Sequence, residues 1–393
     1  MRSTKHSYLP LLIVAILFAG CAKNPVTKQS EINLVSQSKE IKIGNEHYPL
    51  AQQMNGGKYQ IDPELTAYVQ QVGQKLAKVS DRSDLPFEFV VLNDSTPNAW
   101  ALPGGKIAIN RGLLVHLESE AELAAILGHE ITHATARHGA KSMERQVAVV
   151  AGLGILQAVL AIKSDDQTTH DVALTGAAIT AGLVTQKYGR DAESEADHYG
   201  IDYMVKAGYD PKAAVKLQET FVKLMDQKEP NWIKGLFASH PPSQQRVKAN
   251  ETYAQTFSQA NLTIGKEPYQ AKIAHLKKRQ PAYSAFEEGK KKFAKNEYSS
   301  ALTYADKAIK LEPKEALFYA LKADIYTAQK NPQEAIKWYS KAIERDNQYF
   351  NYYLQRGLNY EKLKMTTQAK QDLKQSQQFL PTETAQNALT RLG

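Results

Sequence analysis

The apolar positions of this chain recur mostly at helical spacing, and short β-branched runs occur in one region. After Ser119, apolar residues follow one another three or four positions apart, at Leu123, Ile126, Leu127 and Ile131. Ser119 followed by Glu122 has the pattern of a capping box, which predicts that a helix begins there. The runs 87–92 and 106–109 predict two short strands. The pattern therefore predicts a mainly α domain with a small β-sheet, that is, an α+β fold.

Residues 282–393 contain an internal repeat with a period of 34 residues. Small side chains recur at this interval in two sets, which are Gly289, Ala323 and Gly357, then Ala301, Ala335 and Ala369. The pattern resembles the tetratricopeptide repeat, in which paired helices stack through small residues. It predicts an all-α solenoid of about three repeats, with residues 383–392 as a capping helix and residues 266–281 as the preceding linker. Such a solenoid either binds peptides and partner proteins or only braces its neighbour.

The N-terminus has the features of a bacterial export signal. Arg2 and Lys5 precede an apolar run, and Leu17-Phe18-Ala19-Gly20-Cys21 resembles a lipobox. We therefore expect residues 1–20 to be a lipoprotein signal peptide, Cys21 to carry the lipid, and residues 21–35 to form a linker. Ala22 resembles the residue that sorts lipoproteins to the outer membrane, which favours its periplasmic side. Because Phe18 departs from the usual small aliphatic residue, a soluble periplasmic protein is the alternative.

Composition adds three constraints. With 42% hydrophobic residues, the chain of 393 residues is long enough for substantial cores in about two or three domains. Cys21 is the single cysteine, so no intramolecular disulfide is expected. The formal charge of +8 comes from basic residues interspersed with acidic ones, which indicates a solvated surface and no nucleic-acid partner.

The helix predicted after Ser119 carries His129-Glu130-Ile131-Thr132-His133, which matches H-E-x-x-H. Residues four apart lie on one face of a helix, so His129 and His133 can bind one metal ion while Glu130 stands beside the open coordination position. So short a match also occurs by chance. A third ligand is required, because catalytic zinc usually takes three protein ligands and a water.

Two candidates for the third ligand lie downstream. His138 lies about 180° around an ideal helix from His129, so we interpret it as a helix-end residue rather than a ligand. Glu193 and Asp197 lie four apart on a second predicted helix, so Glu193 can bind zinc while Asp197 accepts a hydrogen bond from a ligating histidine. Glu195 points about 200° away from Glu193 and is assigned a solvated or structural role.

The combination of His129-Glu130-x-x-His133 with Glu193-x-x-x-Asp197 resembles the gluzincin zinc metalloproteases of the HtpX and BepA type, the family of the CAAX prenyl endopeptidase. Residues 98–106 and Ser239-His240-Pro241-Pro242, with Arg246 following, agree with further motifs of this family. The resemblance covers roughly residues 36–250 and implies a zinc metalloprotease domain, which we place at residues 36–265. It implies one zinc ion per chain.

The strand expected after the turn of Pro103, Gly104 and Gly105 is a candidate for substrate binding. An edge strand with free N–H and C=O groups binds an extended polypeptide by adding it to the sheet. We therefore predict that polypeptide substrates contact Gly104, Gly105, Lys106, Ile107 and Ala108. The alternative is that the glycines only form a tight turn. His240 and Arg246 are catalytic candidates for contact with the transition state, and His240 is also a candidate fourth ligand that blocks the zinc.

Two apolar stretches, residues 147–162 and 172–184, lie between the metal-binding segments. Each is shorter than the ~20 residues that a membrane-spanning helix needs, and Gln157 interrupts the first. We expect a helical hairpin that packs against or covers the cleft, with contact to the bilayer or a spanning hairpin as the alternatives.

The predicted chemistry is hydrolysis of peptide bonds without a covalent intermediate. Glu130 is expected to remove a proton from a zinc-activated water and to return it to the leaving amine. The family resemblance implies quality control of unfolded or misassembled envelope and outer-membrane proteins, with the repeats binding substrates or an outer-membrane assembly machine. The competing hypothesis is a chaperone or scaffold for outer-membrane protein assembly whose peptidase activity is latent.

Overall fold

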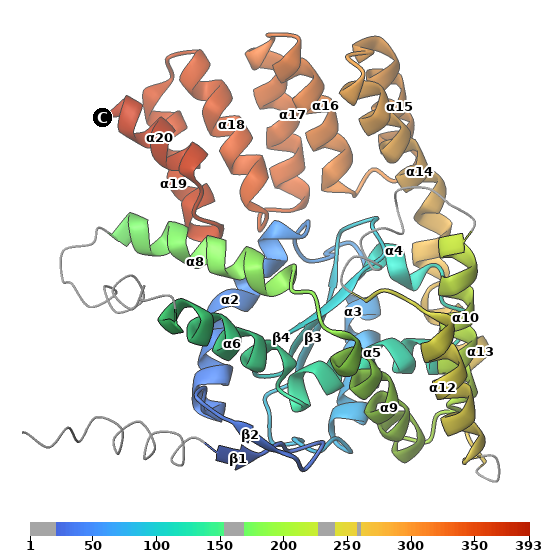
Figure 1. Ribbon diagram of the computed structural model, residues 1–393. Helices are drawn as coiled ribbons and strands as arrows, with labels where there is room; N and C mark the ends of the chain where they lie inside the picture. The colour runs from blue at the N-terminus through green and yellow to red at the C-terminus, as the bar shows by residue number, and fades with distance from the viewer. Residues whose placement is uncertain (1–20, 153–168, 227–239, 258–260) are drawn as a thin grey trace, which may run out of the picture.

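A small mixed sheet lies at the centre of the N-terminal part of the fold (Figure 1). The computed structural model describes residues 21–152, 169–226, 240–257 and 261–393. The strands stand in the order β3 (Glu88–Leu92), β5 (Lys106–Asn110) and β4 (Ala99–Leu102). β5 is the central strand, because it pairs parallel with β3 and antiparallel with β4. β3 and β5 confirm the two predicted strands, whereas the sequence pattern does not indicate β4.

Alternate rows of side chains on this sheet face two different helical layers. One row contains Phe89, Ile107 and Ala101, and it packs in the main core against α3 (Pro63–Ala77) and α5 (Glu120–Thr135). The next row contains Val90, Ala108 and Trp100, and it packs in a second core with residues of α2 (Gln37–Met54), α6 (His138–Gly152) and α8 (Thr169–Val184). The strands are apolar on both faces because helices cover both.

The N-terminal hairpin corrects the linker predicted at residues 21–35. β1 (Cys21–Lys23) pairs antiparallel with β2 (Ser30–Ile32). Asn24 is fully buried, and its Nδ2 donates to the carbonyl of Ala136, 3.0 Å away, where α5 ends. This segment is therefore part of the folded domain, joined to the end of the helix that carries the H-E-x-x-H sequence.

A buried arginine reinforces this junction. Arg137 follows α5 with φ of +64°, and its guanidinium lies 2.7 Å from Glu40, 3.0 Å from Glu31 and 3.2 Å from Glu144. It also donates to the carbonyl of Val35 at 2.7 Å. A buried charge is tolerated only when it is paired in this way, so these contacts hold the N-terminal segment, α2 and α6 together.

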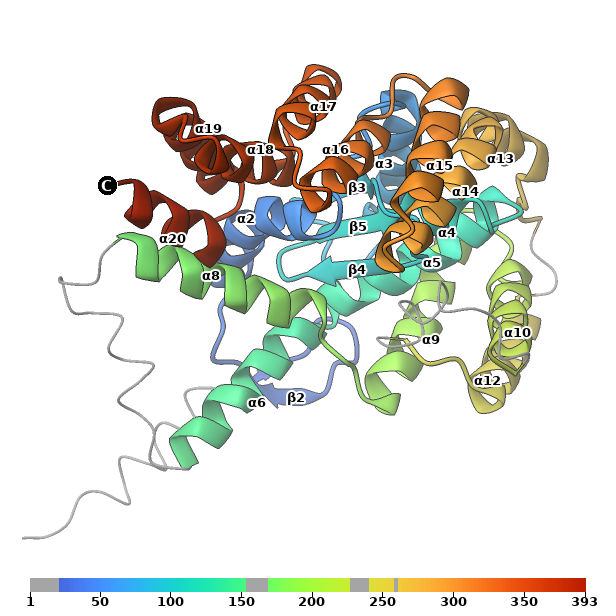
Figure 2. The ribbon, with the colours of Figure 1, turned by 90° about the horizontal axis from the view of Figure 1, so that it is seen from above.

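Three further helices follow α8 and pack against α5 or against one another. They are α9 (Arg190–Lys206), α10 (Lys212–Asp226) and α12 (Gln244–Gln255). α9 packs along α5, and α10 contacts both α5 and α12. Short α4 (Arg111–Leu114) follows β5. Figure 2 shows α9, α10 and α12 grouped at one end of the domain, opposite α8.

The repeat prediction is confirmed. Paired helices stack in a row beyond the sheet (Figures 1 and 2), and their bounds are α14 (Ala274–Ala294), α15 (Tyr298–Leu311), α16 (Ala316–Ala328), α17 (Pro332–Arg345), α18 (Phe350–Lys362) and α19 (Thr366–Phe379). α20 (Glu383–Leu392) closes the row where a capping helix is predicted. The small residues at the repeat interval are buried at the helix contacts, since a Cβ on Gly289 would lie 2.9 Å from Leu321.

The predicted linker at residues 266–281 is wrong. These residues form α13 (Lys266–Lys272) and the first part of α14. Tyr269 is fully buried and its hydroxyl donates to the carbonyl of Leu114 at 2.6 Å. The guanidinium of Arg111 lies 3.4 Å from the ring centre of Tyr283, and Tyr283 belongs to the main core. A cut before residue 282 would therefore divide α14 and remove part of the core that supports α5.

Some predicted segments fall outside the described residues. These are the signal peptide at residues 1–20 and residues 153–162 of the first apolar stretch. The second stretch belongs to α8, which contacts α2 and β4. Within the part of the chain that the structure describes, no helix combines the length and apolar character of a membrane span.

Candidate metal centre

The two histidines of the H-E-x-x-H sequence face the same point from α5. Ser119 is the N-cap of this helix, and its hydroxyl accepts from the N–H of Glu122 at 3.2 Å, as the capping pattern predicts. His129 and His133 stand one turn apart, and their Nε2 atoms lie 3.0 Å from each other. The pair therefore presents two ring nitrogens to one position.

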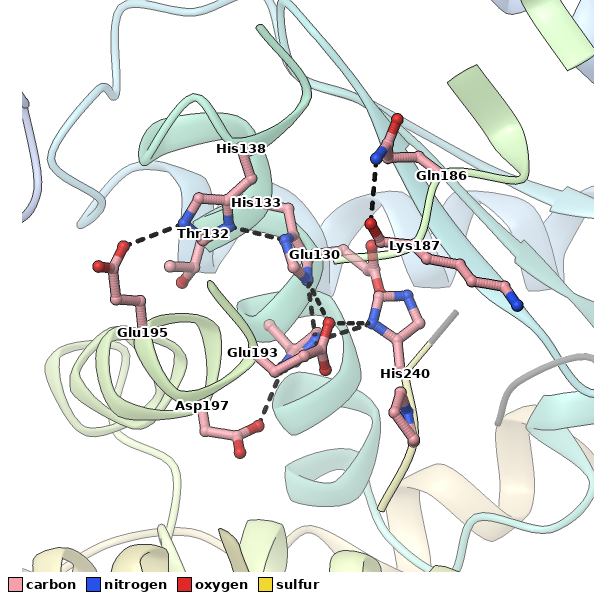
Figure 3. A network of polar contacts seen from close by, with 12 residues as sticks. Glu130, Thr132, His133, His138, Gln186, Lys187, Glu193, Glu195, Asp197 and His240 are labelled. Carbon is pink, nitrogen blue, oxygen red and sulfur yellow. Dashed lines mark hydrogen bonds and ion pairs between the residues drawn. The ribbon is translucent and has the colours of Figure 1, made fainter. Parts of the chain in front are cut away.

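A carboxylate from α9 completes this group. Oε1 of Glu193 lies 3.5 Å from Nε2 of His133, and Oε2 lies 3.6 Å from Nε2 of His129. His240, which precedes α12, adds its Nδ1 at 3.0 Å from Glu193 and 3.2 Å from His129 (Figure 3). The four ligand atoms of His129, His133, Glu193 and His240 all lie within 4.8 Å of one another.

Two glycines allow α9 to approach α5 this closely. A Cβ on Gly128 would lie 2.9 Å from the carbonyl oxygen of Gly200, and a Cβ on Gly200 would lie 3.0 Å from the backbone nitrogen of His129. Glycine inside a helix costs about 1 kcal/mol relative to alanine, so these positions need a reason. The reason here is direct backbone contact, which brings Glu193 within reach of the histidines.

Asp197 contacts His129 on the Nδ1 side of its ring, away from the ligand group, and Arg246 in turn binds Asp197. Oδ1 of Asp197 lies 3.0 Å from Nδ1 of His129, and both Asp197 oxygens accept from the guanidinium of Arg246, at 2.7 and 2.8 Å. The guanidinium also lies 3.0 Å from Oε2 of Glu193. Burial raises the pKa of Asp197, but its contacts with Arg246 and His129 outweigh burial and hold it well below its usual value. Arg246 thus contacts residues around the ligands, and a direct catalytic role for it stays a prediction.

His138 holds His133 in a comparable way. α5 ends at Thr135, and His138 is the first residue of α6, so the interpretation of His138 as the end of the same helix is wrong. Its Nδ1 lies 2.8 Å from Nδ1 of His133, and its Nε2 lies 3.1 Å from Oε2 of Glu195 (Figure 3). His138 is outside the ligand group, as the sequence interpretation has it, but it contacts a ligand.

The donor set fits a divalent cation. Because Asp197 accepts from Nδ1 of His129, the neutral imidazole of His129 has its lone pair on Nε2. Burial lowers the pKa of His133 well below its ordinary value and so favours a neutral ring there also. Burial works to raise the pKa of Glu193, but the surrounding charged and hydrogen-bonding groups outweigh burial and keep this carboxylate ionised. The nitrogen lone pairs of His129 and His133 and the negative charge of Glu193 thus face one position, as a zinc site with nitrogen and oxygen ligands requires.

Glu130 lies beside this group without joining it. Its Oε1 is 3.5 Å from Nε2 of His240, and its buried Oε2 has no hydrogen-bond partner among the described residues. Burial raises the pKa of Glu130, although the nearby imidazoles of His240 and His129 oppose this. A carboxylate with a raised pKa and an unpaired oxygen is suited to accept a proton.

An apolar pocket opens beside Glu130. It lies between α5, α9 and α10, and its lining includes Ile126, Met204, Leu217, Phe221 and Pro242. His129 and His240 also line it, so the pocket is continuous with the ligand group. It has the character of a site for an apolar side chain next to the reacting bond.

The structure corrects the prediction of an edge strand at residues 106–109. Lys106, Ile107 and Ala108 lie on β5, which pairs on both sides and is buried. Gly104 and Gly105 have φ of +77° and +83°, and a Cβ on Gly104 would lie 2.7 Å from the backbone of Ile41. These glycines are therefore needed for the turn and its packing. The strand beside α5 with one partner in the described sheet is β4.

Sequence reasoning missed the contacts of His138, Glu195 and Tyr188. The ring of Tyr188 stacks on that of His133, with centroids 4.0 Å apart and an angle of 18° between the rings. No periodic signal marks Tyr188, which precedes α9. The available signal for Glu195 is its position between Glu193 and Asp197 in a short acidic run.

Two family models match the chain. Residues 63–254 match the model described as peptidase family M48, and residues 286–350 match that of the tetratricopeptide repeat. The first match contains every residue of the ligand group, together with Asp197 and Arg246.

This chain is similar to several curated proteins, including the following three. The putative beta-barrel assembly-enhancing protease of Vibrio cholerae is 32% identical over 247 residues, which cover 60% of this chain and 48% of the relative. The beta-barrel assembly-enhancing protease of Escherichia coli is 31% identical over 235 residues, covering 58% and 45%. The mitochondrial metalloendopeptidase OMA1 of Schizosaccharomyces pombe is 34% identical over 233 residues, covering 58% and 65%. The chain spans about half the length of the two bacterial relatives.

Proposed function

Because this chain contains a peptidase family M48 domain followed by tetratricopeptide repeats, we propose that it is a zinc-dependent metalloendopeptidase. The observation that carries the proposal is the convergence of His129, His133 and Glu193 beside a buried carboxylate, Glu130, that is not part of their group. One zinc ion per chain would be held by these three residues. The ion would supply Lewis-acid activation of a water and of the scissile carbonyl.

The remaining catalytic work falls to residues of the chain. Glu130 accepts the proton of the attacking water through its unpaired Oε2 and returns it to the leaving amine. The pocket between α5, α9 and α10 receives an apolar side chain of the substrate and excludes water from the reacting bond. An extended substrate would lie along β4, whose N–H and C=O groups can extend the sheet by one strand. Residues of the 103–108 turn and strand support β4 from the other side.

The natural substrates we propose are unfolded or misassembled envelope and outer-membrane proteins. Two bacterial relatives carry names that refer to β-barrel assembly, which supports this class of substrate. The repeats would bind substrates or an outer-membrane assembly machine. We place the protein on the periplasmic side of the outer membrane, lipid-anchored through Cys21, with a soluble periplasmic protein as the alternative.

The direct test combines metal analysis with proteolysis. The purified full-length protein is expected to contain about one zinc ion per chain and to degrade an unfolded outer-membrane protein. Chelation of the zinc should stop the degradation, and added zinc should restore it. A protein that retains zinc but cleaves neither unfolded nor misassembled envelope proteins would count against the peptidase assignment and for the scaffold described next.

A second candidate function is a chaperone or scaffold for outer-membrane protein assembly with latent peptidase activity. The position of His240 favours it, because Nδ1 of this residue lies among the ligand atoms and Nε2 lies 3.5 Å from Glu130. A fourth protein ligand closes the coordination position that a catalytic zinc site keeps open for water. We propose that this arrangement is a resting state which substrate binding must displace.

Replacing His240 by alanine is expected to raise the peptidase rate several-fold, because the open coordination position returns to water. Initial rates of cleavage of an unfolded substrate measure this, with zinc content determined in parallel. The exposed His275→Ala is the matched control and should leave the rate unchanged. Loss of cleavage in His240→Ala with zinc retained would instead assign His240 to the transition state.

A further inference from the structure

We propose that His138 and Glu195 form a positioning pair that fixes the tautomer and orientation of His133 as a metal ligand. This inference rests on the proposed metallopeptidase function and adds two residues to it. Neither residue belongs to the ligand group. Their effect is exerted through the imidazole of His133.

The donor and acceptor of each hydrogen bond in the series His133, His138, Glu195 can be assigned by starting from Glu195. An ionised Glu195 can only accept, so Nε2 of His138 must carry the proton of that 3.1 Å contact. A neutral His138 then has its lone pair on Nδ1, which accepts from Nδ1 of His133 at 2.8 Å. The proton on His133 is thereby placed on Nδ1. Its Nε2 keeps the lone pair that faces His129 and Glu193.

Packing holds this chain of contacts in one geometry. The side chain of His138 is 3% exposed, and that of His133 is fully buried. Tyr188 covers the face of the His133 ring, and its ring also lies tilted against that of His138, with centroids 5.9 Å apart. The turn at Arg137 sets where α6 begins, and so sets where the His138 ring can lie. The orientation of His133 is therefore prepared before any metal arrives.

The arrangement makes α9 the common support for all three proposed ligands. Glu193 is itself a ligand, Asp197 contacts His129 directly, and Glu195 contacts His133 through His138. Figure 3 shows Glu195 and Asp197 on α9 with the ligand group beside them, and His138 between Glu195 and His133. Residues outside the ligand set that hold a metal-bound histidine typically change metal affinity by 10–100-fold when they are replaced.

The test measures zinc affinity, by competition with a chelator of known affinity, on full-length apo protein. His138→Leu, which fills the space but cannot accept a hydrogen bond, is expected to bind zinc on the order of 10–100-fold more weakly than wild type. Glu195→Ala should weaken binding several-fold. Glu195→Gln keeps an oxygen acceptor for Nε2 of His138 and should restore binding to within about twofold of wild type. His275→Leu is the control for loss of an exposed histidine.

The outcomes separate this inference from the function on which it rests. If wild type binds no zinc, the proposed function fails. If wild type binds zinc and His138→Leu and Glu195→Ala bind it equally well, only the positioning pair is overturned. Should His138→Leu fail to fold, the Glu195 variants decide the question, because the side chain of Glu195 is partly exposed. Equal affinity of Glu195→Ala and Glu195→Gln would also contradict the proposal.

Discussion

Replacing Glu130 by glutamine is expected to abolish peptide hydrolysis while zinc stays bound. Glutamine has nearly the shape of glutamate but cannot take a proton at neutral pH, so the loss should be on the order of 10²–10⁴-fold, the usual contribution of a general base. Metal is retained because Glu130 is not among the four ligand atoms. Cleavage of an unfolded substrate and zinc content by elemental analysis check the two halves of this expectation.

The control variant Glu251→Gln on α12 removes an exposed glutamate and should change neither activity nor zinc content. Wild-type turnover in Glu130→Gln would show that the base lies elsewhere. The inactive variant should also hold substrates without cleaving them. Proteins trapped by this variant in cells would then be the candidate substrates.

Replacing Arg137 by leucine is expected to destabilise the fold by about 3–5 kcal/mol, the usual cost of removing one partner from a buried ion pair. The guanidinium is 3% exposed and lies within 3.2 Å of three carboxylates, those of Glu31, Glu40 and Glu144. Without Arg137 these acids crowd a buried space, where Glu40 keeps only Arg82 at 2.8 Å. Urea unfolding at neutral pH, followed by circular dichroism, measures the change in the free energy of unfolding.

An exposed ion pair serves as the comparison. Lys42 and Glu46 lie one turn apart on α2 at 3.8 Å, with side chains 74% and 56% exposed. Lys42→Leu should change stability by less than about 1 kcal/mol, because water screens such pairs. If Arg137→Leu unfolds at the same urea concentration as Lys42→Leu, the buried network around Arg137 stabilises the fold no more than an exposed ion pair does.

Local signals predict much of the fold. The capping pattern at Ser119 and the apolar spacing after it predict where α5 begins, and the repeat interval predicts the helix pairs from α14 to α19. Four-residue spacing also predicts that His129 with His133, and Glu193 with Asp197, share a helix face. These predictions depend on contacts within one helix or between neighbours, which the sequence expresses directly.

The remaining errors come from contacts between distant segments. An ideal helix carried through residue 138 would turn His138 away from the ligands, but α5 stops at Thr135, where Arg137 meets carboxylates about 100 residues away in sequence. The sequence pattern likewise does not show the strand order. It therefore predicts β5 as an edge strand, although β4 pairs with its outer side. The sequence likewise does not show that residues 266–281, predicted as a linker, form helices in which Tyr269 is fully buried.

Because α14 is part of the main core, this core is completed late during synthesis of the chain. Leu65 and Leu127 share one apolar cluster with Tyr283, Phe318 and Ile325, which belong to the first repeats. A chain is synthesised from its N-terminus, so these last members of the cluster appear after all four ligand residues have been made. The main core is therefore complete only once the first repeats have been synthesised. The helix that carries His129, Glu130 and His133 therefore gains its last core contacts only after the first repeats have been made.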